Sequence, residues 1–252
     1  MIPYFSFSAV KLGPFTLYIW GMLAALAVIV VFTLVVSRVK KAVEREFLFD
    51  LLIWILVGII IGAKVGYLIQ FPNYFFNHPL EFFNYTQGGL TSYGGFFGAL
   101  LAAFLYFKFH SVKKKTVLFL LDLAAQFLPL GLAIGRLGCF LIKDHPGRTT
   151  TLPWGIVWPD GTVRHPVALY LFLNCLIIFF LLWFIKPKLK PGQLFLFFLN
   201  FYSLGRFLLD FSRSQEPGLS DPRLSFFSIS QWISLLLFLI TAILLKKEVI
   251  KK

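Results

Sequence analysis

Charged residues and cysteines are both scarce in this chain of 252 residues. Only 14% of the residues are charged and 58% are hydrophobic, whereas soluble domains carry about 25% charged residues. This balance excludes a soluble globular domain and predicts an integral membrane protein. The two cysteines, Cys139 and Cys175, are too few for a disulfide framework or a cysteine metal cluster.

Several common catalytic signatures are absent as well. The four histidines and 11 acidic residues do not have metal-ligand spacing, so we expect neither a metal nor a cofactor. The apolar runs contain no G-x-S-x-G elbow and no evident Ser/His pair. The net charge of +13 comes largely from basic residues clustered between apolar runs, so we do not expect a nucleic-acid partner. No cleavable signal pattern follows the first run.

Seven apolar runs are long enough to cross a bilayer as helices, which takes about 20 residues each. With boundaries good to a few residues, they are 15–37, 47–69, 89–109, 116–142, 166–186, 192–212 and 226–245. Three longer segments separate them: 70–88, 143–165 and 213–225. We therefore expect an all-α integral membrane protein, with 1–252 forming one transmembrane domain and the three segments forming small irregular loops.

Basic residues mark one side of the membrane. They concentrate in the 38–46 loop, the 108–115 turn, the 186–190 region and the C-terminal tail, while the opposite side carries few. The positive-inside rule then places the N-terminus outside, the C-terminus in the cytoplasm and the three longer segments on the outer side.

Two arginines, Arg136 and Arg206, lie inside apolar runs. A guanidinium at the centre of a membrane helix costs about 2.5–3.5 kcal/mol on insertion scales, so a chain that accepts this cost twice is expected to use both charges. Helix rise places both in the outer half of the bilayer, at the depth of Lys64 and Tyr93 from two other spans. We expect these four side chains to share one layer. The alternative is that each snorkels separately to the headgroups.

The sixth run places Tyr202, Arg206 and Asp210 on one helical face because they are four residues apart, so Asp210 can pair with Arg206. Small residues at similar spacing predict close helix packing rather than chemistry. They are Gly58, Gly62, Gly66, Gly94, Gly98, Gly131 and Gly135.

Cations that converge at outer-leaflet depth suit an anion, and the anion available there is a lipid phosphate. Arginine binds phosphate through two parallel hydrogen bonds and stays charged. The residues therefore indicate a lipid-phosphate binder or an enzyme that acts on a phospholipid. Cys139, three residues from Arg136, is either a nucleophile activated by the cation or a small buried hydrophobic residue.

Five motifs in order resemble the bacterial phosphatidylglycerol–prolipoprotein diacylglyceryl transferase family over nearly the whole chain. The most specific is G-R-L-G-C-F at 135–140, followed by Asp144 and Gly147, which is similar to the family signature G-R-x-G-N-F…E…G. The others are G-A-K-V-G-Y (62–67), G-G-L-T-S-Y-G-G (88–95), R-H-P-V-A-L-Y (164–170) and Y-S-L-G-R-F-L-L-D-F-S-R (202–213).

The resemblance implies a reaction and its partners. Such an enzyme moves a diacylglyceryl group from phosphatidylglycerol to the lipobox cysteine of a preprolipoprotein, releases glycerol phosphate and forms a thioether. This is the first step of lipoprotein maturation. It implies a multi-pass protein of the bacterial cytoplasmic (inner) membrane with its site toward the outer leaflet. Phosphatidylglycerol, preprolipoprotein signal peptides and membrane lipids are the implied partners.

The resemblance also implies site residues. Arg136 binds the headgroup, Arg206 is a second essential cation, and Tyr93 stands where the family has histidine or tyrosine. Tyr202 and Asp210 position Arg206. The remaining substrate-binding positions are Lys64, Gly94, Gly95, Cys139, Asp144 and Gly147.

Some positions depart from the family pattern. Cys139 and Ile142 replace asparagines, Asp144 replaces a glutamate, and Lys64 stands where arginine is frequent. The base that would deprotonate the acceptor thiol stays open. Tyr93 is one hypothesis, and the outer-loop histidines His145 and His165 are others, although each histidine is also interpreted as an ordinary loop residue.

A second function remains open beside the transferase: a non-catalytic binder or transporter of anionic lipid that uses the same cations. Either function needs access from the bilayer, so we expect a lateral gap between two helices.

Overall fold

The computed structural model describes the chain except residues 14, 40–43, 73–90, 145, 217–222 and 251–252. It forms two compact units. The first joins Met1–Arg38 with Leu118–Lys252, and the second is Val39–Val117.

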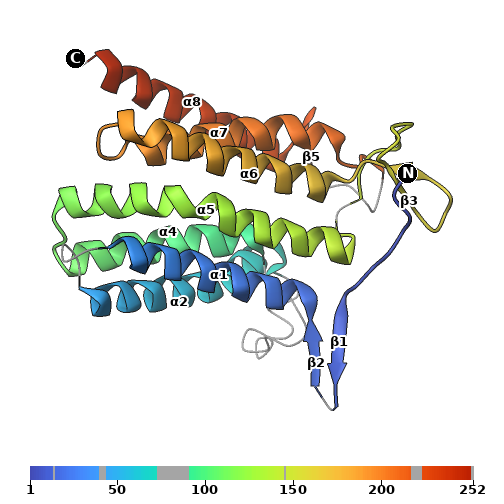
Figure 1. Cartoon of the computed structure of the whole chain (residues 1–252), viewed down its shortest axis with the longest axis horizontal. Helices are drawn as coiled ribbons and strands as arrows, with labels where there is room; N and C mark the ends of the chain where they lie inside the picture. Colours follow the sequence, from blue (N-terminus) through green and yellow to red (C-terminus); the bar gives the residue numbers. More distant parts are fainter. Residues whose placement is uncertain (14, 40–43, 73–90, 145, 217–222, 251–252) are drawn as a thin grey trace. The chain divides into compact units, whose positions relative to one another are not determined.

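Helices dominate both units (Figure 1). The first unit holds α1 (Ile19–Arg38), most of α5 (Lys114–Ile142), α6 (Val167–Ile185), α7 (Gln193–Leu209), α8 (Ile229–Ile250) and two 3-10 turns, η2 (Lys186–Lys188) and η3 (Asp210–Ser212). The second unit holds α2 (Arg45–Gln70) and α4 (Ser92–Phe109). Six described helices are long and apolar enough to span a membrane, and α4 is a shorter apolar helix. The prediction of an all-helical membrane protein with about seven spans is confirmed.

The start of the first span differs from the prediction. The helix begins at Ile19, and the four residues before it, Phe15–Tyr18, form strand β2. β2 pairs antiparallel with β1 (Ala9–Leu12). Gly13 lies between the strands with φ +60°, a conformation that glycine adopts without steric cost. The aromatic and β-branched residues after it favour a strand, which hydropathy alone does not distinguish from the helix that follows.

Two more antiparallel pairs involve the segments predicted to be irregular, and the second of them extends into the predicted span 226–245, whose helix begins only at Ile229. They are β3 (Ile156–Val157) with β4 (Val163–Arg164), and β5 (Arg223–Leu224) with β6 (Phe227–Ser228). Single bridges join Ile2 to Ile156 and Gly147 to Arg213. These segments therefore gather at the end of the first unit that holds the N-terminus, and the C-terminus lies at the other end (Figure 1). Most of the predicted 70–88 loop falls outside the described residues.

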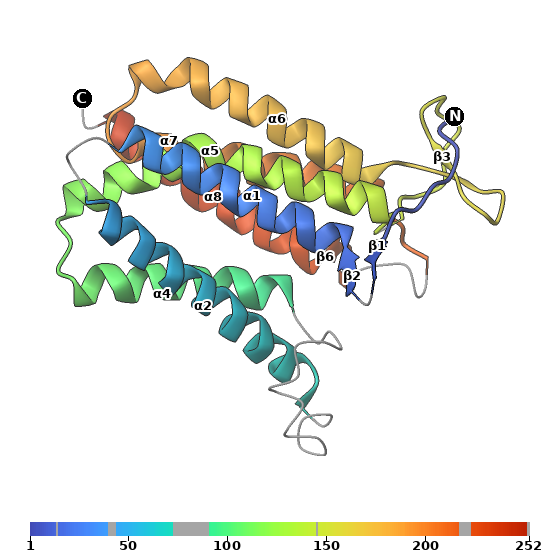
Figure 2. The same cartoon turned by 60° about the horizontal axis from the view of Figure 1, so that its bottom comes forward.

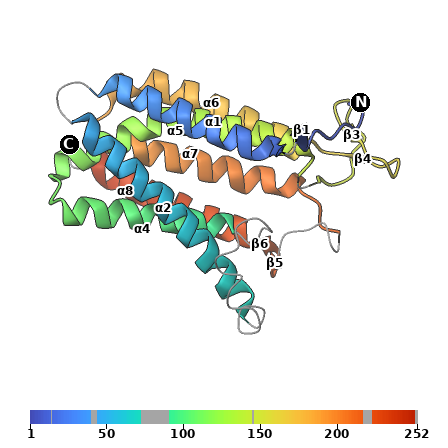
Figure 3. The same ribbon diagram turned by 90° about the horizontal axis from the view of Figure 1, so that it is seen from below.

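The first unit is a set of helices that run alongside one another (Figures 2 and 3). At the end nearest the C-terminus its core consists of residues from α5, α6 and α7: Ala125, Ile178, Leu182, Leu194 and Phe198. Asp122 of α5 fixes the start of α7, because its carboxylate accepts hydrogen bonds from the backbone N–H groups of Gly192 (2.6 Å) and Phe195 (3.0 Å).

The second unit is built on glycines. Figure 2 shows α2 crossing α4, and a Cβ atom added to Gly62 or Gly98 would collide with the backbone of the facing helix. Gly58, Gly66 and Gly94 are equally restricted. The predicted close packing is confirmed for these residues. Gly135 on α5 differs, since a Cβ there would meet nothing within 4 Å.

Candidate active site

Arg136 projects from α5 toward α6 and α7. Its side chain is hydrogen-bonded to that of Tyr202 on α7, and it interacts electrostatically with the thiols of Cys139 and Cys175. Both cysteines are buried and free. Because α5, α6 and α7 all contribute to its surroundings, this guanidinium is held inside the first unit.

Arg206 on α7 belongs to a buried polar cluster with α8. Its Nη1 lies 2.9 Å from the Asp210 Oδ1, and its Nη2 donates to the Ser230 Oγ at 2.9 Å. The side chains of Arg206 and Asp210 are 12% and 2% exposed, so the pair is well shielded. Asp210 also accepts a hydrogen bond from Ser228 and lies 3.6 Å from the Arg213 Nη1. The predicted pairing of Asp210 with Arg206 is confirmed.

The side chain of Arg136 contacts α7 one helical turn before Arg206, which belongs to α7 itself. Arg136 contacts Tyr202, and Tyr202 is four residues before Arg206 on the same helical face. Both guanidinium groups therefore have partners within the first unit, and the layer shared with Lys64 and Tyr93 stays a prediction. A cavity that both arginines line stays a prediction.

The other members of the predicted layer lie in the second unit. Lys64 of α2 is 2% exposed, and Gly94 and Gly95 lie in the first turns of α4. Thr91 caps that helix by accepting a hydrogen bond from the Gly94 N–H at 3.3 Å. The side chain of Tyr93 is outside the described part of the chain. The roles of Lys64, Tyr93, Gly94 and Gly95 stay predictions.

The signature segment ends α5 in a left-handed turn. The Asp144 N–H donates to the Cys139 carbonyl at 3.0 Å and the Lys143 N–H donates to the Phe140 carbonyl at 3.4 Å, which is the Schellman pattern of a helix C-terminus. Lys143 takes the position with positive φ, +57°, where glycine is the usual residue. Ile142 is the last helical residue.

Gly147, the last residue of the signature, has a packing role. A Cβ atom there would collide with the backbone of His165, and Gly147 also forms a bridge with Arg213. The glycine therefore lets the two segments that carry His165 and Arg213 approach closely, and a direct role in substrate binding stays a prediction.

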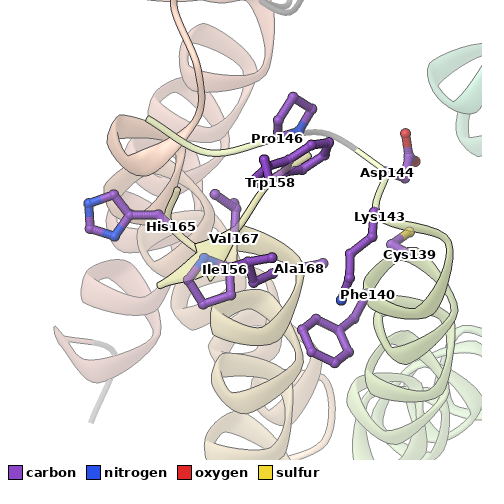
Figure 4. A pocket seen from close by; sticks show the side chains of 11 residues that line it. Cys139, Phe140, Lys143, Asp144, Pro146, Ile156, Trp158, His165, Val167 and Ala168 are labelled. Carbon is purple, nitrogen blue, oxygen red and sulfur yellow. The ribbon is translucent and has the colours of Figure 1, made fainter. Parts of the chain in front are cut away.

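A small pocket of about 20 Å³ lies beside this helix end (Figure 4). Most of its wall is apolar, from Phe140, Ile156, Trp158, Val167 and Ala168, and its polar lining residues include Cys139, Lys143, Asp144 and His165.

Lys143 is the buried amine of this pocket. Lys143 as a whole is 8% exposed. Its Nζ lies 3.5 Å from the centre of the Phe5 ring and 3.8 Å from that of Phe140, and it has no hydrogen-bond partner among the described residues. Burial lowers the pKa of Lys143 to about 8.

A clamp at the same end of the unit was not foreseen. Arg164 donates two parallel hydrogen bonds to Glu216, at 2.8 and 2.9 Å, and these bonds hold the pKa of the Glu216 carboxyl below its usual value. The partners are 52 residues apart, so spacing could not reveal them. The R-H-P motif at 164–166 was the only signal.

His165 is engaged in a separate contact. Its Nδ1 lies 3.0 Å from the Tyr170 hydroxyl, which also accepts from the Trp154 Nε1 at 2.8 Å. Burial and the nearby Arg148 lower the pKa of His165. The other loop histidine, His145, is outside the described residues. Within the described ranges, no group of three or more His, Cys, Asp or Glu side chains is placed to hold a metal.

Comparison with known proteins gives a consistent result. The sequence profile described as "Prolipoprotein diacylglyceryl transferase" matches residues 8–246. The chain is 35% identical to the phosphatidylglycerol–prolipoprotein diacylglyceryl transferase of Bordetella avium (strain 197N), over 94% of this chain and 92% of that protein. It is 33% identical to the enzyme of the same name from Cupriavidus metallidurans, over 96% and 93%. For that of Nitrosospira multiformis the identity is 34%, over 94% and 84%. The chain therefore belongs to the prolipoprotein diacylglyceryl transferase family.

Proposed function

We propose that this chain transfers a diacylglyceryl group from phosphatidylglycerol to the lipobox cysteine thiol of preprolipoproteins, at the outer leaflet of the bacterial cytoplasmic membrane. The thiol sulfur attacks the glyceryl carbon, the bond from that carbon to the phosphate oxygen breaks, and glycerol phosphate leaves. The thiol proton ends on the released phosphate or on water. A thioether joins the lipid to the protein substrate.

The observation that carries this proposal is the placement of two shielded guanidinium groups in a chain of this family. Arg206 lies on α7, and Arg136 contacts α7 at Tyr202, one turn before Arg206. The leaving phosphate gains negative charge as the carbon–oxygen bond breaks. Cations that are already positioned in a site shielded from water stabilise that charge without reorganisation. In this scheme Arg136 binds the headgroup phosphate through its planar fork, and Arg206 supplies the second cation.

Three further residues support the two arginines in this scheme. Tyr202, which the sequence assigned to Arg206, orients Arg136 in this scheme, because its side chain is hydrogen-bonded to that arginine. Asp210 orients Arg206 through the ion pair at 2.9 Å. Lys64 of α2, which the sequence predicts at a similar depth of the bilayer, would add positive charge.

The orientation follows from the charges between the helices. Basic residues at the inner ends of the helices predict a cytoplasmic C-terminus, which places the end of the first unit that holds the N-terminus outside. The signature segment, the pocket at Lys143 and the Arg164–Glu216 clamp all lie at that end. A preprolipoprotein would then present its cysteine from the outer leaflet, and phosphatidylglycerol would enter through a lateral gap.

A reconstitution assay tests the proposal. The purified chain is incubated with vesicles that contain phosphatidylglycerol and with a peptide that carries a lipobox cysteine. We expect a peptide whose mass increases by one diacylglyceryl group, together with an equal amount of glycerol phosphate. A matched peptide with serine in place of the cysteine should stay unmodified. Absence of product, where an active relative gives it, would contradict the proposal and favour a non-catalytic lipid binder or transporter.

A further inference from the structure

The amine of Lys143 is buried at the end of α5, over the rings of Phe5 and Phe140. The residue occupies a left-handed helix-end position that favours glycine. Its Nζ is buried without a hydrogen-bond partner among the described residues. A group held in an unfavourable conformation, with its polar atom removed from water, is characteristic of functional sites.

One residue connects the pocket at Lys143 with the proposed phosphate-binding arginine. Cys139 joins the two regions, because it lines the pocket at Lys143 and also interacts electrostatically with Arg136. In Figure 4 the Lys143 side chain runs from the end of α5 into the space bounded by Phe140, Ile156 and Ala168. A thiol that enters this pocket would therefore approach both the amine and the neighbourhood of Arg136.

We propose that the amine of Lys143 is the base that removes the proton from the acceptor cysteine, an inference that rests on the transferase function proposed above. The neutral Nζ takes the S–H proton, and the thiolate sulfur forms the new bond to the glyceryl carbon. The carbon–oxygen bond breaks with its electron pair going to the phosphate. The lysine ammonium then returns its proton to the released glycerol phosphate or to water.

The acid–base properties of the pocket suit this step. Burial lowers the pKa of Lys143 to about 8, close to the value of about 8.5 for a free thiol. Proton transfer between groups of matched pKa, near the working pH, is efficient. An apolar wall keeps the amine largely dry, and the two aromatic rings fix its position.

The other titratable groups that line the pocket are less suited to act as the base. Asp144 and Cys139 come from the same helix end, and His165 from the segment before α6. The His165 ring is bonded to Tyr170 and turns away from the remaining lining side chains in Figure 4. The N-terminal segment contributes the ring of Phe5, which does not titrate.

Three substitutions separate a base from a packing or charge effect. Lys143→Met keeps most of the side-chain volume, Lys143→Arg keeps the positive charge but stays protonated, and Lys143→Gly fits the left-handed backbone. In the reconstitution assay we expect kcat to fall about 10²- to 10⁴-fold in all three, the range for loss of a general base. Lys11→Met, an exposed lysine on β1, should keep the wild-type rate.

Chemical rescue provides the readout that a structural role would not produce. Lys143→Gly leaves space for a small primary amine, so adding ethylamine should restore part of kcat. The restored rate should rise with pH as more of the added amine becomes neutral, and rescue by equal concentrations of guanidine should fail. In the wild-type chain kcat/KM should rise as pH increases through about 8, the pKa to which burial lowers Lys143, because the neutral amine is the active form.

The outcomes distinguish this inference from the proposed function. If the wild-type chain transfers lipid and Lys143→Arg does so at the wild-type rate, or if Lys143→Gly is slow and no amine rescues it, the base is not Lys143. If the wild-type chain itself gives no product, the transferase function fails and this inference fails with it.

Discussion

The two helix pairs α2–α4 and α7–α8 are held together in different ways. In α2–α4 the interface consists of glycines that let one backbone touch the other, and the described polar contacts lie near its ends. The Thr91 hydroxyl bonds the Ala63 carbonyl at one end, and the Tyr106 hydroxyl bonds the Phe47 carbonyl at the other. Close backbone packing, closed by these hydrogen bonds, therefore holds this pair together.

The α7–α8 pair uses polar side chains along its length. Asn200 donates to Thr241 at 3.0 Å, Arg206 donates to Ser230, and Gln231 donates to the Phe207 carbonyl. The difference lies in what joins the helices: side-chain hydrogen bonds link α7 to α8, whereas close backbone contact at glycines links α2 to α4. Substitutions in the two pairs should accordingly fail in different ways.

Substitution of the two arginines should reduce lipid transfer more than any other change. Arg136→Ala and Arg206→Ala should each abolish lipid transfer, since removal of one charge-stabilising donor costs about 10²- to 10³-fold in comparable sites, and each arginine also binds substrate here. Arg136→Lys should be poor as well, because a point charge does not replace the planar fork. The assay is peptide modification by the purified variants.

The control for these variants is Arg223→Ala, which removes an arginine of β5 whose described hydrogen bond goes to the backbone carbonyl of Phe226. It should stay active. All variants should insert into the membrane like the wild type, and near-normal transfer by Arg136→Ala would contradict the headgroup role.

Next in size is the substitution Asp210→Asn. It removes the charge that balances Arg206, and breaking a buried ion pair costs about 3–5 kcal/mol. We expect a lower thermal unfolding temperature in detergent together with slower transfer. Asp160→Asn removes an acid whose side chain is 56% exposed and should change the unfolding temperature little. Equal effects of the two would show that Asp210 does not hold Arg206.

A third substitution addresses the glycine pair. Gly62→Val places atoms against the backbone of Gly94, and such overpacking costs about 1–3 kcal/mol. The unfolding temperature should fall as α2 and α4 separate. Gly21→Val on α1, where a Cβ meets nothing within 4 Å, is the matched control and should be tolerated. If both variants unfold alike, close packing does not stabilise α2–α4.

The smallest effect is expected from Asn200→Leu. It removes hydrogen bonds to Thr241 and to the Phe238 carbonyl, and single interhelical hydrogen bonds in membrane proteins average about 0.6 kcal/mol. Thermal unfolding should show a small shift with transfer preserved. A complete loss of transfer would mean that α7–α8 geometry is far more sensitive than the comparison implies.

The sequence predicts the fold well because hydrophobic length and charge dominate it. The helices lie close to the predicted spans, and the Arg206–Asp210 pair follows from helical spacing. The β1–β2 hairpin escapes prediction because it joins an apolar helix without a change in hydropathy.

Contacts between distant segments escape prediction for another reason. The Arg164–Glu216 clamp and the contact between Lys143 and Phe5 depend on how the segments between the helices fold over one another, which spacing along the chain does not encode. The contact of Arg136 with Tyr202 likewise requires knowing which faces of α5 and α7 meet.

The most direct test of the account asks whether Arg136 and Arg206 bind one phosphate. The affinity for phosphatidylglycerol is measured for the wild type, Arg136→Lys, Arg206→Lys and the double variant. Independent sites add to within about 0.3–0.5 kcal/mol. The account predicts a clearly non-additive result, with the double variant losing less binding free energy than the two single losses combined. Additive losses would contradict a shared phosphate site.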